Sequence, residues 1–259
     1  MSYKKNFKIR VLLLQIVLAS GLSLGSIGCE TVPKNQPALY NLDKANNYYA
    51  RSRFVIAADL YRKTLTATPK SKYRQDALLG LADSLYKSKE YFESSLNYIK
   101  FLTLYPLSNS SSHATFYLGM CQYFEAGDAE RDQTSALKAI NTFTTLLNKH
   151  GDSSFAPYAI KYRAELRKRY EAYLFTVANF YYRVDKNISA IGRFKDYIKN
   201  YPRSKRVPEA YYKIASSYYK ESAYRKTAAT LTMLIESYPD SKWSKKGIEL
   251  SSLLKLQSY

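Results

Sequence analysis

Proline recurs at a fixed spacing along this chain, and that spacing limits the possible folds more than any other feature of the sequence. Four segments have the form x-Pro-x-Ser: TPKS at 68–71, YPLS at 105–108, YPRS at 201–204 and YPDS at 238–241. The first two prolines are 37 residues apart, and so are the last two. The gap between the pairs contains HGDS at 150–153, where Gly151 takes the place of proline. A period in the thirties is typical of stacked helical repeats.

Between the prolines the residues fit the tetratricopeptide pattern, in which each repeat is a pair of helices. The pattern has a small residue at position 8 in the first helix and at position 20 in the second, where the two helices approach most closely, and a large residue at position 24. The third repeat fits only if residues are added between its helices. Repeat by repeat, the three positions hold Ala45, Ala57 and Tyr61; Ala82, Ser94 and Tyr98; Gly119, Ala139 and Phe143; Ala178, Ala190 and Phe194; Ala215, Thr227 and Leu231.

Such helix pairs cannot bury their apolar faces alone, so the repeats must stack and share one continuous core. Proline disfavours helical geometry in the residue before it, so each proline ends the second helix of a repeat. The serine that follows is predicted to cap the next helix. We therefore predict an all-α fold, a tetratricopeptide-repeat solenoid of about five helix pairs with a C-terminal capping helix. The 27 tyrosines fit repeat packing better than a ligand-binding stripe.

Two insertions interrupt the period. The first is AGDAERDQ at 126–133, inside the third repeat. Its acidic residues alternate with Arg131, so the segment is interpreted as a helix cap and a surface contact rather than a calcium site. Arg131 and Asp132 are accordingly candidate partner-binding residues.

The second insertion lengthens the first helix of the fourth repeat. Residues 155–183 contain no glycine, and their one proline, Pro157, falls in the first turn, where a helix tolerates it. They are predicted to form one helix. Two interpretations of its charge remain open, a solvated face and a docking ridge that leaves the stack. Arg167 is a candidate partner-binding residue. The basic residues concerned are Lys161, Arg163, Arg167, Lys168 and Arg169.

The N-terminus has the pattern of a lipoprotein signal. Four basic residues in the first ten are followed by an apolar run from Val11 to Leu24, which is short for a membrane span of about 20 residues. Small residues then precede Cys29. We predict a signal peptide over 1–28, acylation of Cys29 and a lipidated tether over 29–37. The alternative is an ordinary signal peptide or an anchor helix with an incidental cysteine. The repeat domain would span 38–259, with N-terminal repeats at 38–154 and C-terminal repeats at 155–259.

Composition argues against catalysis and against nucleic acid. The chain has two histidines, His113 and His150, which are not at metal-ligand spacing, and no phosphate-binding or nucleophile motif is present. We therefore expect no enzyme activity and no cofactor or metal. The formal net charge is +19, but an exported, lipid-anchored chain meets anionic headgroups and acidic proteins rather than cytoplasmic nucleic acid. Cys121 is interpreted as a small core residue, and a reactive or paired thiol is the alternative.

The chain resembles the BamD family of outer-membrane β-barrel assembly lipoproteins. The resemblance covers nearly the whole chain after Cys29. It rests on the lipidated N-terminus, the five repeats, RDQ at 131–133, the long segment at 155–183, AIGRFKDYIKNYP at 190–202 and YPDSKW at 238–243. The His150-Gly151 pair, where Tyr-Pro is usual, and the strongly basic balance are departures from the family.

The resemblance implies a scaffold on the periplasmic face of the outer membrane. Its C-terminal repeats would bind the periplasmic domains of the barrel-forming subunit BamA, its N-terminal repeats would offer a groove to unfolded outer-membrane proteins, and other assembly-machine lipoproteins would join. The family's arginine that faces BamA matches Arg193, which follows the repeat pattern at position 23 and is expected to point away from the core. A repeat lipoprotein of cell-wall, division or pilus assembly is the alternative function.

Overall fold

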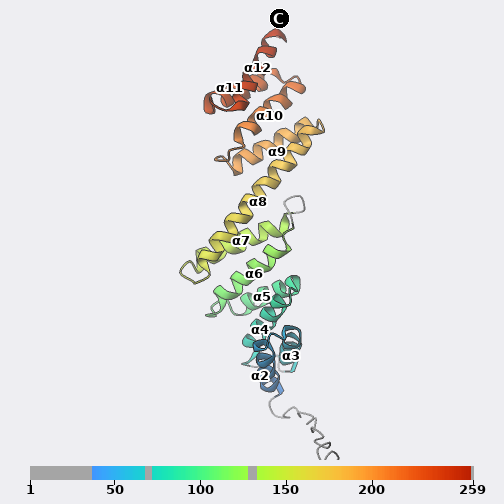
Figure 1. Cartoon of the computed structure of the whole chain (residues 1–259), viewed down its shortest axis with the longest axis vertical. Coiled ribbons are helices and arrows are strands. Elements are labelled where there is room, and N and C mark those ends of the chain that lie inside the picture. The colour runs from blue at the N-terminus through green and yellow to red at the C-terminus, as the bar shows by residue number, and fades with distance from the viewer. Residues whose placement is uncertain (1–36, 68–71, 128–132, 258–259) are drawn as a thin grey trace, which may run out of the picture.

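The computed structural model describes residues 37–67, 72–127 and 133–257. Within these ranges the chain forms eleven helices and no strand, which confirms the predicted all-α solenoid of five helix pairs and a capping helix. The helices are α2 (Pro37–Ala50), α3 (Phe54–Ala67), α4 (Arg74–Lys87), α5 (Tyr91–Leu104), α6 (Ser111–Glu125), α7 (Thr134–Lys149), α8 (Ala156–Arg183), α9 (Asn187–Asn200), α10 (Val207–Lys220), α11 (Tyr224–Ser237) and α12 (Lys242–Gln257). Each packs on its neighbours in the chain, and together they form an elongated stack with α2 at one end and α12 at the other (Figure 1).

The predicted repeat register is confirmed by burial. Ala82, Ala178 and Ala215, all at position 8, have no exposed surface. In the second repeat the Ser94 hydroxyl donates a hydrogen bond to the Ala82 carbonyl at 2.8 Å, so the two small positions touch directly. In the third repeat a Cβ added to Gly119 would lie 2.6 Å from the Phe143 ring, so only glycine fits beneath that ring.

The turns inside the repeats are alike at the level of the backbone. Ser52, Lys89, Asp185 and Ser222 each adopt positive φ just after the first helix of their repeat. In the second repeat the Glu90 amide donates to the Leu85 carbonyl and the Lys89 amide donates to the Tyr86 carbonyl, at 2.9 and 3.0 Å. These two bonds satisfy carbonyl groups that the end of α4 would otherwise leave unpaired.

At the corners between repeats, the prediction that the serine after each proline caps the next helix needs a correction. Ser108 was predicted to cap the next helix, but α6 begins at Ser111 and its N-cap is Ser110. Ser108 instead closes the turn: its amide donates to the Tyr105 carbonyl at 3.1 Å, and its hydroxyl accepts from the Ser110 amide at 3.2 Å. The corner needs extra residues to turn the chain, so this serine lies too early to cap.

The same turn recurs at Ser204 and Ser241, and only Ser241 directly precedes its helix, α12. The third corner keeps the fold of the others without a proline. There the Ser153 amide donates to the His150 carbonyl at 3.1 Å, and the Ala156 amide donates to the Ser153 carbonyl at 3.0 Å. Glycine in place of proline therefore preserves this corner.

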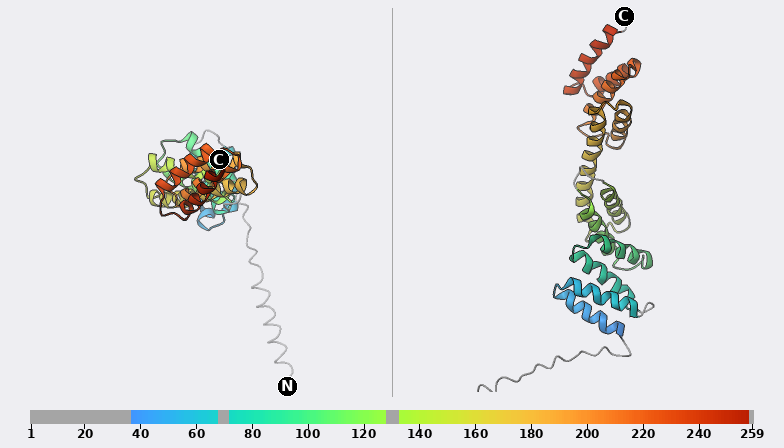
Figure 2. Two further views of the ribbon diagram at one scale, coloured as in Figure 1. Left: turned by 90° about the horizontal axis from the view of Figure 1, so that it is seen from above. Right: turned by 90° about the vertical axis from the view of Figure 1, so that its right-hand side faces the viewer.

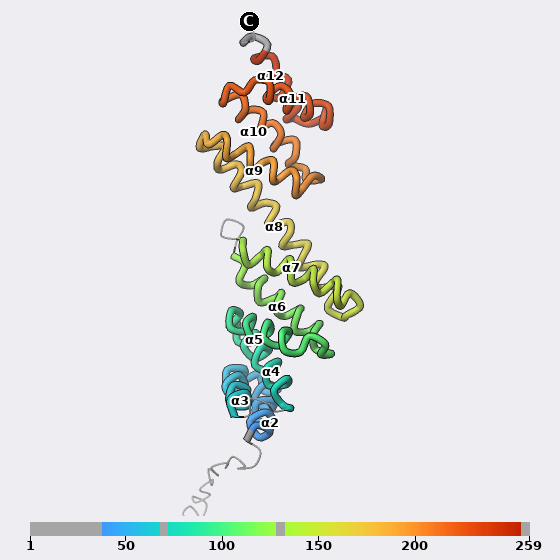
Figure 3. Tube along the Cα trace, turned by 180° about the vertical axis from the view of Figure 1, so that it is seen from behind, coloured from blue at the N-terminus to red at the C-terminus, as the bar shows by residue number. Residues whose placement is uncertain are grey.

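Helix α8 joins the two halves of the stack (Figure 2). It has 28 residues, which confirms the predicted long helix, and is about 42 Å long at 1.5 Å per residue. Its first half packs through Ala159 and Leu166 on the core of the third repeat, and its second half packs through Phe175 and Ala178 on the core of the fourth. The tube trace shows α8 crossing between α7 and α9 (Figure 3).

Among the described residues, none of the helices is both long and apolar enough to cross a membrane.

Candidate functional site

Arg193 lies on the surface of α9, as its position in the repeat predicts. Its side chain is exposed, while the next residue, Phe194, is fully buried. The guanidinium carbon lies 4.5 Å from the centre of the Tyr181 ring on α8, within the range of a cation–π interaction. The contact holds the guanidinium at the junction of α8 and α9, and the side chain as a whole is exposed.

A shallow groove of about 240 Å³ runs beside Arg193 between the same two helices. Tyr197 forms part of its wall, and its hydroxyl donates to Glu171 at 2.9 Å. Burial is the main reason why the pKa of Tyr197 is raised to about 12, so this hydroxyl stays protonated at neutral pH. The groove is lined by Tyr170, Tyr173, Leu174, Val177, Arg193, Asp196, Tyr197 and Asn200.

Arg167 is exposed and precedes Tyr170, which lines this groove, on α8. Burial raises the pKa of Tyr201, just after α9, and the positive charge of Arg167 opposes that rise. Since Arg193 lies beside Tyr181 and α8 rises 1.5 Å per residue, the two arginines are separated by about 21 Å along α8. The structure therefore places Arg167 and Arg193 on one helix pair, far enough apart to contact different parts of a partner.

Other basic residues of α8 are engaged within the protein. Arg169 donates to Glu165 at 3.1 Å and to the Ala126 carbonyl at 3.4 Å, and it lies over the Tyr123 ring. Arg163 donates to Thr144 at 3.5 Å. Part of the charge of this helix therefore stabilises packing, while Arg167 is exposed, and the docking ridge stays a prediction. Arg131, Asp132 and Cys29 lie outside the described residues.

A polar cluster in the N-terminal repeats was not predicted from the sequence. Oδ1 of Asp83, on α4, accepts a hydrogen bond from the Tyr98 hydroxyl at 2.5 Å and lies 2.8 Å from Nε2 of His113, on α6. Burial, followed by the charge of Asp83, raises the pKa of Tyr98. The His113 ring lies 4.6 Å from the Tyr117 ring, centre to centre. Asp83 therefore links two repeats through one carboxylate.

Aromatic side chains continue from this cluster over α4, α5, α6 and α8. Tyr86 lies 4.9 Å from Tyr117, and Tyr91 stacks on Phe124 at 4.7 Å. Phe124 has 47% of its surface exposed. The row reaches solvent at Phe124. Tyr86, Tyr91 and Tyr117 pack against the hydrophobic core, which agrees with the interpretation of the tyrosines as repeat packing.

Comparison with known proteins gives consistent matches. The YfiO family, described as "Outer membrane lipoprotein", matches residues 34–221, and a tetratricopeptide-repeat family matches residues 209–241. The "Outer membrane protein assembly factor BamD" of Caulobacter vibrioides is 20% identical over 88% of this chain and 77% of its own length. The protein of the same description from Rickettsia prowazekii is 24% identical over 89% of this chain and 93% of its own length. Among solved structures, the "TPR2AB-domain:pHSP90-complex of yeast Sti1" is 16% identical over 80% of each chain, with a TM-score of 0.41.

Proposed function

This chain belongs to the YfiO family of outer membrane lipoproteins, and on that premise we propose that it is a lipid-anchored scaffold of the β-barrel assembly machine. In this role it binds the periplasmic domains of BamA through its C-terminal repeats. The general role in outer-membrane protein assembly follows from its BamD relatives. The specific contacts are our proposal.

The observation that carries the BamA contact is the exposed Arg193 held against Tyr181. An arginine with a fixed guanidinium plane presents paired donors to a carboxylate and forms a forked, charge-assisted ion pair. Because Tyr181 already restricts the side chain, less conformational freedom is lost on binding. Arg167 adds a second positive charge further along α8, so the partner surface is expected to be acidic. Arg131 and Asp132 are proposed as contacts of the same assembly.

The N-terminal repeats are proposed to receive unfolded outer-membrane proteins. Strands of such proteins carry apolar and aromatic side chains on alternate positions. The aromatic row that ends at Phe124 offers apolar contacts to such side chains, and tyrosine hydroxyls beside it offer hydrogen bonds. Binding of this kind tolerates many sequences.

Anchoring at the periplasmic face of the outer membrane is proposed to depend on Cys29. Two or three acyl chains on this residue would hold the protein firmly, because each buried methylene contributes about 0.8 kcal/mol. The scaffold needs no cofactor and carries out no catalytic step. Other assembly lipoproteins would join the same complex.

Purification from detergent-solubilised envelopes tests this proposal. A tagged copy of the full chain should retain BamA through washing, and retention should fall for Arg193→Glu. Recovery of peptidoglycan-associated or pilus components without BamA would instead favour the alternative, a scaffold of cell-wall, division or pilus assembly.

A further inference from the structure

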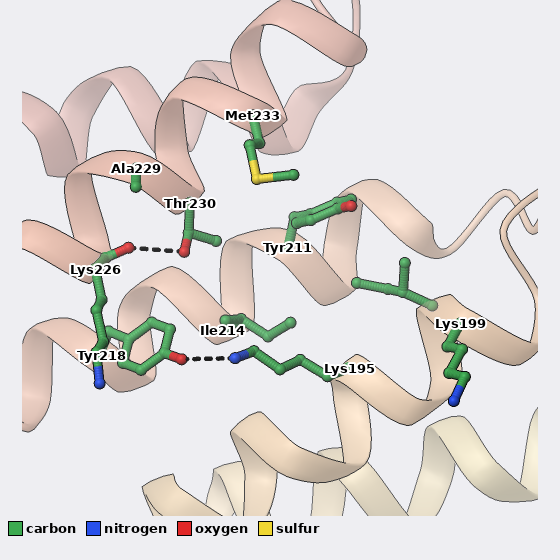
Figure 4. A pocket seen from close by; sticks show the side chains of 10 residues that line it. Lys195, Lys199, Tyr211, Ile214, Tyr218, Lys226, Ala229, Thr230 and Met233 are labelled. Atoms are coloured by element: carbon green, nitrogen blue, oxygen red, sulfur yellow. Dashed lines mark hydrogen bonds between the residues drawn. The ribbon is translucent and has the colours of Figure 1, made fainter.

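A second groove lies on the opposite side of α9 from Arg193. It has a volume of about 530 Å³ and is formed by α9, α10 and α11 (Figure 4). That volume is within the range of roughly 300–1,000 Å³ that is usual for ligand pockets. The residues of α9 that line it differ from those that line the Arg193 groove, so α9 separates two distinct surfaces. The lining residues are Lys195, Ile198, Lys199, Tyr211, Ile214, Tyr218, Lys226, Ala229, Thr230 and Met233.

The floor of this groove is apolar. Ile214 on α10 is 2% exposed and lies at the bottom, between Tyr211 and Tyr218 of the same helix. On the α11 side, Met233 is 53% exposed and faces the groove. A methionine at the edge of an apolar surface adapts its shape to different partners. A bulky apolar side chain can therefore enter between α9 and α11.

The rim of the groove is positively charged. Lys195 donates a hydrogen bond from Nζ to the Tyr218 hydroxyl at 2.9 Å, and Lys226 lies over the same ring, with Nζ 5.7 Å from its centre. Lys199 is exposed on the same helix as Lys195. The ten lining residues include these three lysines and no acidic residue. Each ammonium group has three donors, so Lys195 keeps donors for a ligand beyond its bond to Tyr218.

We propose that this groove docks a segment of a partner protein in which a bulky apolar side chain is flanked by carboxylates. The apolar side chain would occupy the floor over Ile214, and the carboxylates would pair with Lys195, Lys199 and Lys226. Charge complementarity identifies the segment as acidic, since the rim offers only cations. The proposal does not depend on BamA binding, because Arg193 faces the other groove.

A peptide-binding titration tests this inference. The full chain, reconstituted in phosphatidylcholine nanodiscs, is titrated with a fluorescein-labelled peptide in which Phe-Leu is flanked by two aspartates on each side. One control peptide replaces the aspartates with lysines, and another replaces Phe-Leu with Ser-Ser. We expect the acidic apolar peptide to bind at least tenfold more tightly than either control, and its affinity to fall with added salt.

Variants locate the binding. Met233→Asp and the double variant Lys195→Glu/Lys226→Glu are each expected to weaken binding at least tenfold. The matched controls are Ile188→Asp, at a side chain 69% exposed outside the groove, and Lys245→Glu, at an exposed lysine of α12. Both controls should bind like the unmodified chain. Circular dichroism and melting curves show whether each variant is folded.

Three outcomes would overturn the inference. They are no binding of the acidic apolar peptide, equal binding of the Ser-Ser control, and equal loss of affinity in groove and control variants. Titration with lauric acid provides a further check: if lauric acid binds in the groove and the peptide does not, the groove is a lipid site and the proposal is wrong.

Discussion

The guanidinium carbon of Arg193, on α9, lies 4.5 Å from the centre of the Tyr181 ring, on α8. The two residues belong to different helices of the fourth repeat, and the ring of Tyr181 is half-buried. The position of the arginine is therefore set by the packing of the repeat. An exposed cation–π contact contributes about 0.5–1 kcal/mol, which is enough to favour one orientation of a long side chain.

The stacking of the repeats can be tested by enlarging a close-approach residue. Ala215 has no exposed surface and packs in the same core cluster as Leu231. Leucine at this position must overpack the contact, so Ala215→Leu is expected to lower the free energy of unfolding by ~1–3 kcal/mol. Thermal unfolding followed by circular dichroism measures the change. Lys245→Ala, at an exposed site, should leave the melting temperature nearly unchanged; equal shifts for both would show that Ala215 is not at a tight contact.

The turns inside the repeats offer a way to stabilise the protein. Lys89 and Ser222 adopt φ values of 66° and 55°. In this left-handed region the Cβ atom lies too close to the backbone, which costs ~1–2 kcal/mol. Glycine removes this cost, but its greater conformational entropy stabilises the unfolded chain by about 0.5–1 kcal/mol. Lys89→Gly and Ser222→Gly should each raise stability by up to about 1 kcal/mol in urea unfolding. Lys100→Gly, in the helical part of α5, should lower it by about the same amount, and stabilisation by all three changes would refute the argument.

The Cys121 thiol is predicted to be unreactive in the folded protein. It is fully buried, and its Sγ donates to the Ser94 hydroxyl at 3.4 Å. Burial raises the pKa of Cys121 from 9.0 to about 12. The folded state thus favours the neutral thiol. The stability that the protein gains from keeping the thiol neutral is fully present below pH 9 and is lost as the pH rises toward 12.

A thiol-labelling experiment checks this prediction. In a Cys29→Ser variant Cys121 is the one remaining cysteine, and a disulfide reagent should label it only at the rate of unfolding. Labelling should become complete in denaturant. Rapid labelling of the folded protein at neutral pH would be inconsistent with the buried position.

The predicted lipid anchor can be tested directly in cells. Cys29→Ser should abolish incorporation of radiolabelled palmitate, because the replacement hydroxyl is not the thiol that takes the diacylglyceryl group. Cys121→Ser is the matched control and should label normally. Labelling of Cys29→Ser at the normal level would rule out acylation at this residue.

The sequence predicts those features that depend on local spacing. Position 8 and position 20 residues such as Ala178 and Ala190 could be located from the proline period, because small residues are required wherever paired helices touch. The length of α8 followed from an uninterrupted run without glycine. The role of Ser108 was predicted wrongly, because the number of residues in the corner decides whether a serine reaches the helix end.

Features that join distant segments were beyond sequence reasoning. Asp83 and His113 lie on different repeats, and no position in the repeat pattern assigns them a contact. The groove over Ile214 is lined by residues of α9, α10 and α11, and the spacing within one repeat does not fix how these three helices lie. Angles between helices are set by the shapes of many side chains together, so a one-dimensional pattern does not determine them.

The affinity of the full chain for purified BamA periplasmic domains, measured for the unmodified chain and for Arg193→Glu, tests the central claim most directly. A desolvated ion pair that loses one partner typically costs ~2–5 kcal/mol, so we predict that Arg193→Glu weakens binding by roughly thirtyfold or more, with circular dichroism showing an intact fold. Arg225→Glu, at an exposed arginine of α11, makes the same charge change away from the α8–α9 groove and should bind nearly normally. Unchanged affinity for folded Arg193→Glu, or equal losses for the two variants, would contradict the claim that Arg193 contacts BamA.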